Sequence, residues 1–300
     1  MKRIWLITVL FCLFQPWVGA QPGFFPFEKK GKAGYYAASP GDSVRGMLLL
    51  IPGYGQTPEM LLQDSVLLSG AATHGLALLA VNRPAHLLLT PESFRLLTSV
   101  FEDAARRFKA PPDKLAIGGF AEGGILAIQY TAECWSAAGY HPLRPAAVFG
   151  VETPVELSEW WKSLQRDQIR RSSPEAMAES AYWLDVLSRE LGGAPDTLES
   201  VYRKRSPYHL GDGQPGKEQF LLSAGVRLYY FGDLQWQLGV MHRELSDLPA
   251  TPASVLIKRL LLKGHPDASL VFTPDTWGDK EKNDCLQWVA ESMGIGSRKE

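Results

Sequence analysis

The chain has 300 residues, of which 45% are hydrophobic and 21% charged, an ordinary composition for a globular protein. Its formal net charge is −1, so no basic excess indicates nucleic acid or an anionic membrane surface as a partner. The length fits one large α/β domain that carries an insertion, or two small domains.

The N-terminus predicts a secretory signal peptide over residues 1–20. Two basic residues precede the apolar run Ile4–Phe14, which is too short to span a bilayer comfortably. Val18 and Ala20 suit a cleavage site after Ala20. An uncleaved anchor is the alternative, but the run is short and Pro16 interrupts it. We therefore expect an exported protein, periplasmic or extracellular, with no membrane contact after cleavage.

Cleavage would leave Cys134 and Cys285 in an exported protein, where two cysteines can pair. The fold argued below sends their helices to opposite faces of a sheet, too far apart for a disulfide bond. Two buried free thiols are therefore the favoured interpretation. No spacing in the sequence resembles a metal site, and we expect no cofactor.

The first half of the chain alternates between short apolar runs and helical patterns. Residues 21–39 form a lead-in, of which we expect residues 21–35 to be poorly ordered, with a candidate strand over 33–38. Apolar runs typical of buried strands follow at 45–51, 76–81, 115–117 and 146–150. Helices are indicated after Thr57, over 91–109 and over 125–137. This alternation predicts a mostly parallel sheet with helices on both faces.

The second half opens with a different pattern. About residues 156–210 look mainly helical, and we interpret them as a helical cap inserted over the sheet. A separate domain is the alternative, but the alternation then resumes, with strands at 226–231 and 268–273 and helices at 252–263 and 284–293. The prediction is one α/β domain over residues 40–295, followed by a tail over residues 296–300.

One strand-to-helix turn carries a pattern of chemical interest. Gly119-Phe120-Ala121-Glu122-Gly123 has the spacing of the nucleophile elbow G-x-S-x-G, with alanine at its centre. In that turn glycines avoid clashes, and the central residue takes a strained conformation that presents its side chain at the carboxyl edge of the sheet. A generic glycine-rich turn is the alternative. Upstream, Ile51-Pro52-Gly53-Tyr54-Gly55 follows a buried strand, where a loop N–H supplies half of an oxyanion hole.

With these two loops and this order of elements, about residues 40–295 resemble the α/β-hydrolase superfamily. More narrowly, they are similar to its exported esterase and peptidase-like members with a helical cap. The resemblance implies a nucleophile at the elbow, an acid after a late strand and a histidine after the last strand. It also implies an oxyanion hole and cleft formed around Gly53, Tyr54, Gly55, Phe120 and Glu122.

The chain departs from that pattern at the nucleophile and at the histidine. Ala121 has no lone pair with which to attack a carbonyl group. Asp233 follows the strand at 226–231 and can serve as the acid. The sequence holds no histidine beyond His265, which precedes the last strand. We therefore expect a degenerate catalytic triad.

Three other polar residues lie near these positions in the sequence. Glu122 adjoins the elbow, where interaction of its charge with a helix N-terminus is favoured over a catalytic role. His265 is best explained as part of a helix-to-strand connection. His242 is interpreted as a surface or packing residue on a helix.

Tryptophans are frequent in the expected cap and pocket loops. They can line a cleft for carbohydrate, aromatic or peptide ligands, or they can pack between the cap and the sheet, which is the favoured interpretation. Trp236 and Trp277 are the candidate binding residues among them. The full set is Trp160, Trp161, Trp183, Trp236 and Trp277.

Three functions are compatible with this sequence. The favoured one is a non-catalytic protein that binds an unidentified small molecule or protein in the former active-site cleft. The second is an active esterase or peptidase with displaced groups, in which Ser206 or Ser223 approaches a histidine. The third is an interaction module whose cleft is filled by the cap tryptophans.

Overall fold

The computed structural model describes residues 22–27, 33–41, 43–136, 142–210, 216–273 and 276–296. The predicted signal peptide, residues 1–20, lies outside the described residues, and so do residues 297–300 of the predicted tail. Within the described ranges, no helix combines the length and the apolar character needed to cross a membrane.

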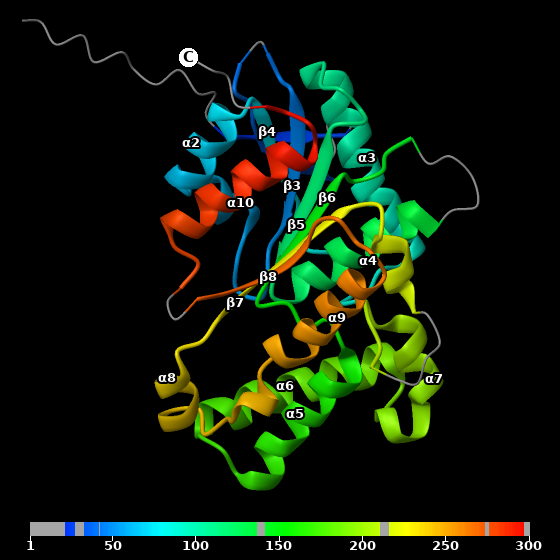
Figure 1. Ribbon diagram of the computed structural model, residues 1–300, viewed down its shortest axis with the longest axis vertical. Coiled ribbons are helices and arrows are strands. Elements are labelled where there is room, and N and C mark those ends of the chain that lie inside the picture. Colours follow the sequence, from blue (N-terminus) through cyan, green and yellow to red (C-terminus); the bar gives the residue numbers. More distant parts are fainter. Residues whose placement is uncertain are drawn as a thin grey trace, which may run out of the picture.

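A single eight-stranded sheet runs through the described part of the molecule (Figure 1). Its spatial order is β1-β2-β4-β3-β5-β6-β7-β8, and every pair from β4 to β8 is parallel, whereas β1 and β2 are antiparallel at one edge. The predicted mostly parallel sheet is confirmed. The strands are β1 (Gly23–Pro26), β2 (Gly34–Ala38), β3 (Gly46–Ile51), β4 (Leu76–Ala80), β5 (Leu115–Phe120), β6 (Ala147–Val151), β7 (Gly225–Phe231) and β8 (Ala268–Thr273).

Every residue of the central strands β3, β4, β5 and β6 is buried. This burial explains why these strands are continuous apolar runs in the sequence, without the alternation of a half-exposed sheet. In register, Leu49 of β3 lies between Leu79 of β4 and Ile117 of β5. The nucleophile-elbow pattern therefore follows a strand in the middle of the sheet.

The structure corrects the prediction of a poorly ordered lead-in. Gly23–Pro26 forms β1, which pairs with β2 along its whole length. The Phe25 ring stacks on Tyr35, with centroids 5.8 Å apart, and lies edge-on against Phe108, at 5.5 Å. Aromatic packing thus orders a segment whose glycine, proline and lysine content indicated a loop.

The helices connect the parallel strands, and several begin at side-chain caps, such as Thr57, Asp64, Thr90 and Ser173. Two helices begin earlier in the chain than predicted: α4 begins at Glu122, directly after Ala121, and α10 begins at Asp279, five residues before the predicted start at position 284. The helices are α1 (Pro58–Leu62), α2 (Ser65–Thr73), α3 (Pro91–Phe108), α4 (Glu122–Ser136), α5 (Leu157–Arg170), α6 (Pro174–Leu191), α7 (Pro195–Arg205), α8 (Leu234–Gly239), α9 (Ala250–Leu262) and α10 (Asp279–Ser292).

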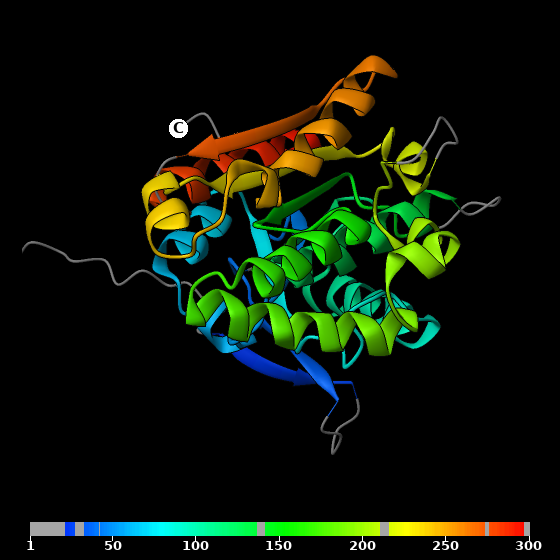
Figure 2. The same ribbon diagram turned by 90° about the horizontal axis from the view of Figure 1, so that it is seen from below.

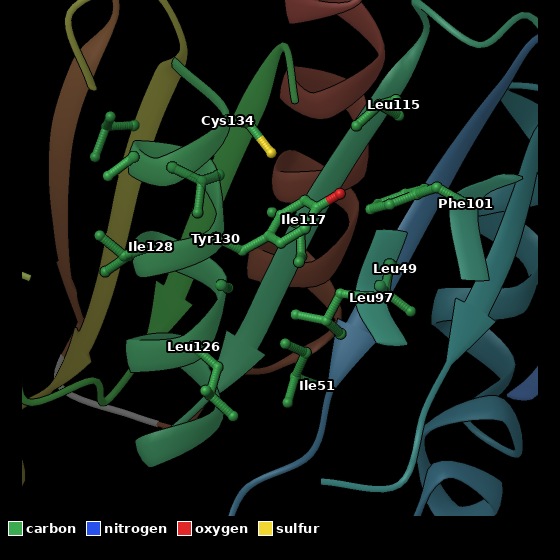
Figure 3. Packing of buried hydrophobic residues seen from close by; sticks show 14 of the residues in the cluster. Leu49, Ile51, Leu97, Phe101, Leu115, Ile117, Leu126, Ile128, Tyr130 and Cys134 are labelled. Atoms are coloured by element: carbon green, nitrogen blue, oxygen red, sulfur yellow. The ribbon is translucent and has the colours of Figure 1, made fainter. Parts of the chain in front are cut away.

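Helices cover both faces of the sheet (Figure 2). On one face, α3, α4 and α9 pack over a core that includes Leu49, Leu97 and Ile117, shown in Figure 3. On the other face, α1, α2 and α10 pack over a second core. Cys134 belongs to the first core and Cys285 to the second, and both are buried free thiols, as predicted. Burial raises the pKa of each thiol to about 12.

Between β6 and β7 the chain forms α5, α6 and α7, which lie beyond the carboxyl ends of the central strands (Figures 1 and 2). Their own core contains Trp161, Trp183 and Tyr202. Leu88, from the loop after β4, and Ile125 of α4 join this core and so attach the cap to the α/β layer. The space next to the β5–α4 turn is therefore enclosed on one side by α6.

Candidate functional site

Ala121 lies at the point where β5 ends and α4 begins. Its φ is +45°, in the left-handed region that residues with a Cβ atom rarely adopt. Its N–H donates to the Val151 carbonyl at 2.7 Å, and its carbonyl accepts from the Gly124 N–H at 3.1 Å. These bonds hold Ala121 in the strained conformation that the elbow pattern predicts.

The glycines around Ala121 are required by close approach of the backbone. A Cβ atom on Gly119 would lie 2.3 Å from the Gly123 carbonyl group, and one on Gly123 would lie 2.5 Å from the Ile51 carbonyl oxygen. On Gly53, a Cβ atom would lie 2.8 Å from the Phe120 carbonyl oxygen. The loop after β3 and the elbow therefore pack directly against each other, as the elbow pattern requires.

A cleft of about 930 Å³ opens over Ala121, between the sheet and the cap. A second hollow of about 270 Å³ adjoins it. We call the larger hollow the main cleft and the smaller one the side pocket. Both are lined by Ala121, Glu122, Glu152, Glu179 and Trp183.

The predicted oxyanion loop reaches the main cleft in part. Gly53 and Tyr54 line it, as does Phe120 from the elbow, whereas Gly55 does not. The Gly53 N–H donates to Gln56 Oε1 at 2.9 Å, so this amide is already engaged. The Tyr54 side chain is 62% exposed at the mouth of the cleft.

Glu122 is buried, with its side chain only 1% exposed. Its Oε1 atom lies 3.5 Å from Arg83 Nε and has no hydrogen-bond partner among the described residues. Burial raises the pKa of the carboxyl group, and this is opposed by the N–H of Glu122 itself, the Arg83 charge and the N–H of Tyr54. In an active elbow, backbone N–H groups at these two positions stabilise an oxyanion. Here a carboxylate of the protein lies beside them.

Asp233, the residue predicted as the acid, lines neither of the two hollows around Ala121. Its Oδ1 atom accepts the Trp236 N–H at 2.8 Å and so caps α8, and the residue is exposed. The structure therefore corrects this prediction, because helix capping uses the carboxylate that was expected to orient a base.

The α/β-hydrolase pattern predicts a histidine in the loop after β8. This loop instead places Thr276 and Trp277 in the main cleft. The Trp277 ring lies against Phe120 and Phe149, with centroid distances of 5.0 and 6.2 Å. Its Nε1 atom is buried without a hydrogen-bond partner in the described structure. An indole N–H is a donor only, so it cannot take a proton from a nucleophile.

Five of the six histidines fall within the described residues, and none of these five lines the main cleft or the side pocket. His265 is buried, with Nε2 at 2.8 and 3.1 Å from two backbone carbonyls, as expected for a structural connection. His242 is exposed, as predicted for a surface residue. However, it follows α8 with a φ of +56° and does not lie on a helix.

The serines proposed as displaced nucleophiles have other surroundings. Ser206 is buried, and its Oγ atom accepts the Leu157 N–H at 3.2 Å, which joins α5 to the end of α7. Ser223 is exposed next to β7. Within the described residues, neither serine lines the two hollows around Ala121.

Solved structures of esterases and serine hydrolases match this chain over nearly its whole length. The carboxylesterase EstE1 from a metagenomic library matches with a TM-score of 0.59 at 13% identity, covering 94% of this chain and 90% of its own. The fluorophosphonate-binding serine hydrolase FphF of Staphylococcus aureus matches with a TM-score of 0.57 at 12% identity, covering 90% and 99%. An esterase of the bacterial hormone-sensitive lipase family matches with a TM-score of 0.57 at 15% identity, covering 91% and 85%.

The protein has the α/β-hydrolase fold. No protein-family model matches the sequence, and no curated protein matches it. At these identities the likeness concerns the fold, so the chemistry of this α/β-hydrolase-fold protein must be argued from its own residues.

Glu152, which the sequence did not single out, lies directly after β6 and lines both hollows. Its φ is +53°, and its Oε1 atom accepts the backbone N–H of Phe231. Burial raises the pKa of the Glu152 carboxyl group to about 7, although the Phe231 N–H opposes this shift. The available signal was a charged residue immediately after an apolar strand, at the edge where the elbow also ends.

Lys282 and Asp64 are two further unpredicted residues of the main cleft. Lys282 Nζ lies 2.7 Å from Asp64 Oδ2 and 5.9 Å from the centroid of the Trp277 ring. The two residues are 218 positions apart, so no local pattern could pair them. Within the described ranges, no group of three or more His, Cys, Asp or Glu side chains is arranged to hold a metal ion.

The tryptophans divide between the two predicted roles. Trp183 lines both hollows, Trp160 and Trp236 line the side pocket, and Trp277 lines the main cleft. Trp161 packs within the cap, edge-on against Tyr202, with ring centroids 6.2 Å apart. The tryptophans thus both pack within the protein and line the two hollows, and those of the cap leave the main cleft open.

Proposed function

We propose that this protein is an exported, non-catalytic α/β-hydrolase-fold protein that binds a ligand or partner in the former active-site cleft. The proposal depends chiefly on Ala121. A methyl group occupies the turn that presents the nucleophile in an active hydrolase, at an open cleft.

Two further features support the absence of hydrolysis. Trp277 occupies the loop that carries the base in active relatives of this fold, and it has no proton-accepting nitrogen. The Glu122 carboxylate lies close to the Glu122 and Tyr54 amides. A developing negative charge on a substrate would be repelled by that carboxylate at the place where an active enzyme stabilises it.

The size of the main cleft supports binding over the function of an interaction module with a filled cleft. A volume of about 930 Å³ lies within the range of sites that hold small ligands. Aromatic side chains line it together with several charged and polar groups, a combination that can both bury and orient a ligand.

Hydrolysis of a panel of short-chain p-nitrophenyl esters by residues 21–300, with a fluorophosphonate probe alongside, tests the proposal. FphF, which is described as fluorophosphonate-binding, is the positive control. We expect neither turnover above the buffer rate nor covalent labelling. Turnover with labelling would overturn the proposal in favour of an active esterase or peptidase with displaced groups, and mass spectrometry of the labelled peptide would identify the serine.

Export is a separate part of the proposal. It is supported by residues 1–20, in which basic residues are followed by an apolar run and then by small residues that suit a cleavage site. Expression of the whole chain in a bacterium, followed by fractionation and N-terminal sequencing, tests it. We expect a periplasmic or secreted product that begins at Gln21. A product that keeps Met1 would contradict cleavage, and recovery of that product in the membrane fraction would favour the uncleaved anchor.

A further inference from the structure

The charged side chains of the main cleft do not balance. Among the residues that the structure describes, four carboxylates line it, against one cationic side chain, Lys282. Three of the four carboxylates are ion-paired: Asp64 with Lys282 at 2.7 Å, Glu122 with Arg83 at 3.5 Å and Glu179 with Arg243 at 2.9 Å. One carboxylate, that of Glu152, is left over.

The Glu152 carboxylate makes no ion pair in the described part of the chain; Arg243, which lines the side pocket with it, is paired with Asp167 and Glu179. The Glu152 carboxylate accepts one hydrogen bond, from the backbone N–H of Phe231, and burial is what disfavours its charge. A half-buried carboxylate without a counter-ion is costly in the folded protein. Its cost is relieved when a positive charge enters the cleft.

Aromatic rings form another wall of the same cleft. Tyr54, Tyr182 and Trp183 contact one another, with ring centroids 4.9 to 5.8 Å apart. Tyr54 and Tyr182 are 62% and 39% exposed, so part of their ring surface is available to a ligand. The faces of such rings attract cations through their quadrupoles.

We propose that the main cleft binds a compact organic cation, a protonated amine, which the Glu152 carboxylate and the rings of Tyr54, Tyr182 and Trp183 hold. This inference rests on the proposed function as a ligand-binding protein and names the chemical class of the ligand. An anion in this cleft would be opposed by the unpaired Glu152 carboxylate, and a neutral molecule would leave Glu152 without a counter-charge.

Three probes that share a phenyl ring and differ mainly in charge test the proposal. They are 2-phenylethylammonium, the neutral 2-phenylethanol and the anionic 3-phenylpropanoate, each titrated into the protein by calorimetry or by ligand-observed NMR. We expect the ammonium probe to bind at least about tenfold more tightly than the alcohol, with the carboxylate binding most weakly.

Two variants assign the preference to the residues named. Glu152→Gln keeps the shape of the side chain and removes its charge, so the ammonium and alcohol probes should then bind within about twofold of each other. Tyr182→Leu keeps an apolar side chain without the ring face. It should weaken binding of the ammonium probe several-fold more than binding of the alcohol. Glu175→Gln, an exposed carboxylate at the start of α6 that does not line the cleft, is the matched control and should leave the order unchanged.

The outcomes separate this inference from the proposed function. Equal or tighter binding of the alcohol or the carboxylate probe would overturn the assignment to cations while leaving a binding cleft. Failure of the ammonium probe to bind at millimolar concentration would also overturn it. Ester turnover with fluorophosphonate labelling is a different readout, and it would overturn the proposed function instead.

Discussion

The indole ring of Trp277 lies edge-on against the ring of Phe120, with the two centroids 5.0 Å apart. Phe120 immediately precedes Ala121, and Trp277 follows the last strand of the sheet. The two loops that carry nucleophile and base in an active hydrolase are therefore joined here by aromatic packing. Trp277 also contacts Tyr229 from inside the sheet, so this packing extends into the core.

Trp277, which cannot accept a proton, occupies the loop after β8, so a serine introduced at the elbow alone should not produce hydrolysis. We expect Ala121→Ser to show no esterase turnover above that of the unchanged protein, since a serine hydroxyl without a base is a weak nucleophile. The measurement is the p-nitrophenyl ester panel with fluorophosphonate labelling. Thermal unfolding of the variant should confirm that it folds, and labelling of Ser at position 121 would show that a base exists nearby.

The close packing of the elbow against the loop after β3 predicts a large effect of a single methyl group. Gly123→Ala would place a Cβ atom 2.5 Å from the Ile51 carbonyl oxygen and 2.6 Å from that of Pro52. Neither backbone can move without disturbing β3 or α4, so we expect a loss of about 3 kcal/mol in the free energy of unfolding. Urea titration measures it.

Gly239→Ala, at the end of α8, is the control for Gly123→Ala. A Cβ atom on Gly239 has no neighbour within 4 Å, and the residue has no positive φ. The control should change the free energy of unfolding by less than about 1 kcal/mol. Equal effects of the two substitutions would show that the elbow is not tightly packed in solution.

Much of the fold could be predicted because the sheet is buried on both faces. The strands β3, β4 and β6 are uninterrupted apolar runs, and their signal survives without knowledge of their neighbours. β1 could not be predicted in the same way. Its order depends on the contact of Phe25 with Phe108 of α3, a residue that is distant in the sequence.

The site was less predictable than the fold. The elbow was visible because its glycines are local, whereas the pairing of Lys282 with Asp64 spans 218 positions. Glu152 depends on sheet register, since Val151 lies opposite Tyr229 and so brings the Phe231 N–H to the Glu152 carboxyl group. Asp233 was misassigned because an acid after β7 can cap a helix as well as orient a base.

Glu152 predicts a dependence of stability on pH with a definite sign. Its pKa rises from an ordinary value of 4.5 to about 7 in the folded protein, because burial disfavours the charge. The folded state then binds the proton more tightly than the unfolded chain between these two values, so stability from this group is lost as pH rises through that window. Near pH 4, Glu152→Gln should therefore have the same free energy of unfolding as the unchanged protein. At pH 8 its free energy of unfolding should be higher by about 3 kcal/mol.

Urea unfolding of both proteins at a series of pH values tests the Glu152 prediction. The other carboxylates of the cleft are present in both proteins, so the difference between the two curves reports the substituted group. Glu175→Gln, at an exposed position of α6, should show little difference at any pH. A constant difference between Glu152→Gln and the unchanged protein across the range would show that Glu152 titrates normally.

Arg243 links the segment after α8 to two helices of the cap. Its guanidinium group donates to Asp167 Oδ2 of α5 at 2.7 and 3.0 Å and to Glu179 Oε2 of α6 at 2.9 Å. Asp167 is 2% exposed, so Arg243→Met would leave a buried carboxylate without its counter-ion. We expect a loss of about 3 kcal/mol in the free energy of unfolding, measured by urea titration.

The exposed pair of Arg189 with Asp185, at 2.8 Å on α6, is the control for Arg243. Both of its side chains are more than 60% exposed, so Arg189→Met should cost less than about 1 kcal/mol. Because Glu179 lines the main cleft, Arg243→Met should also leave a second carboxylate there without a counter-ion. The variant should therefore bind 2-phenylethylammonium more tightly, relative to 2-phenylethanol, than the unchanged protein does. An equal cost for the two arginines, with unchanged probe binding, would show that the Arg243 network contributes neither to the cap nor to the charge of the cleft.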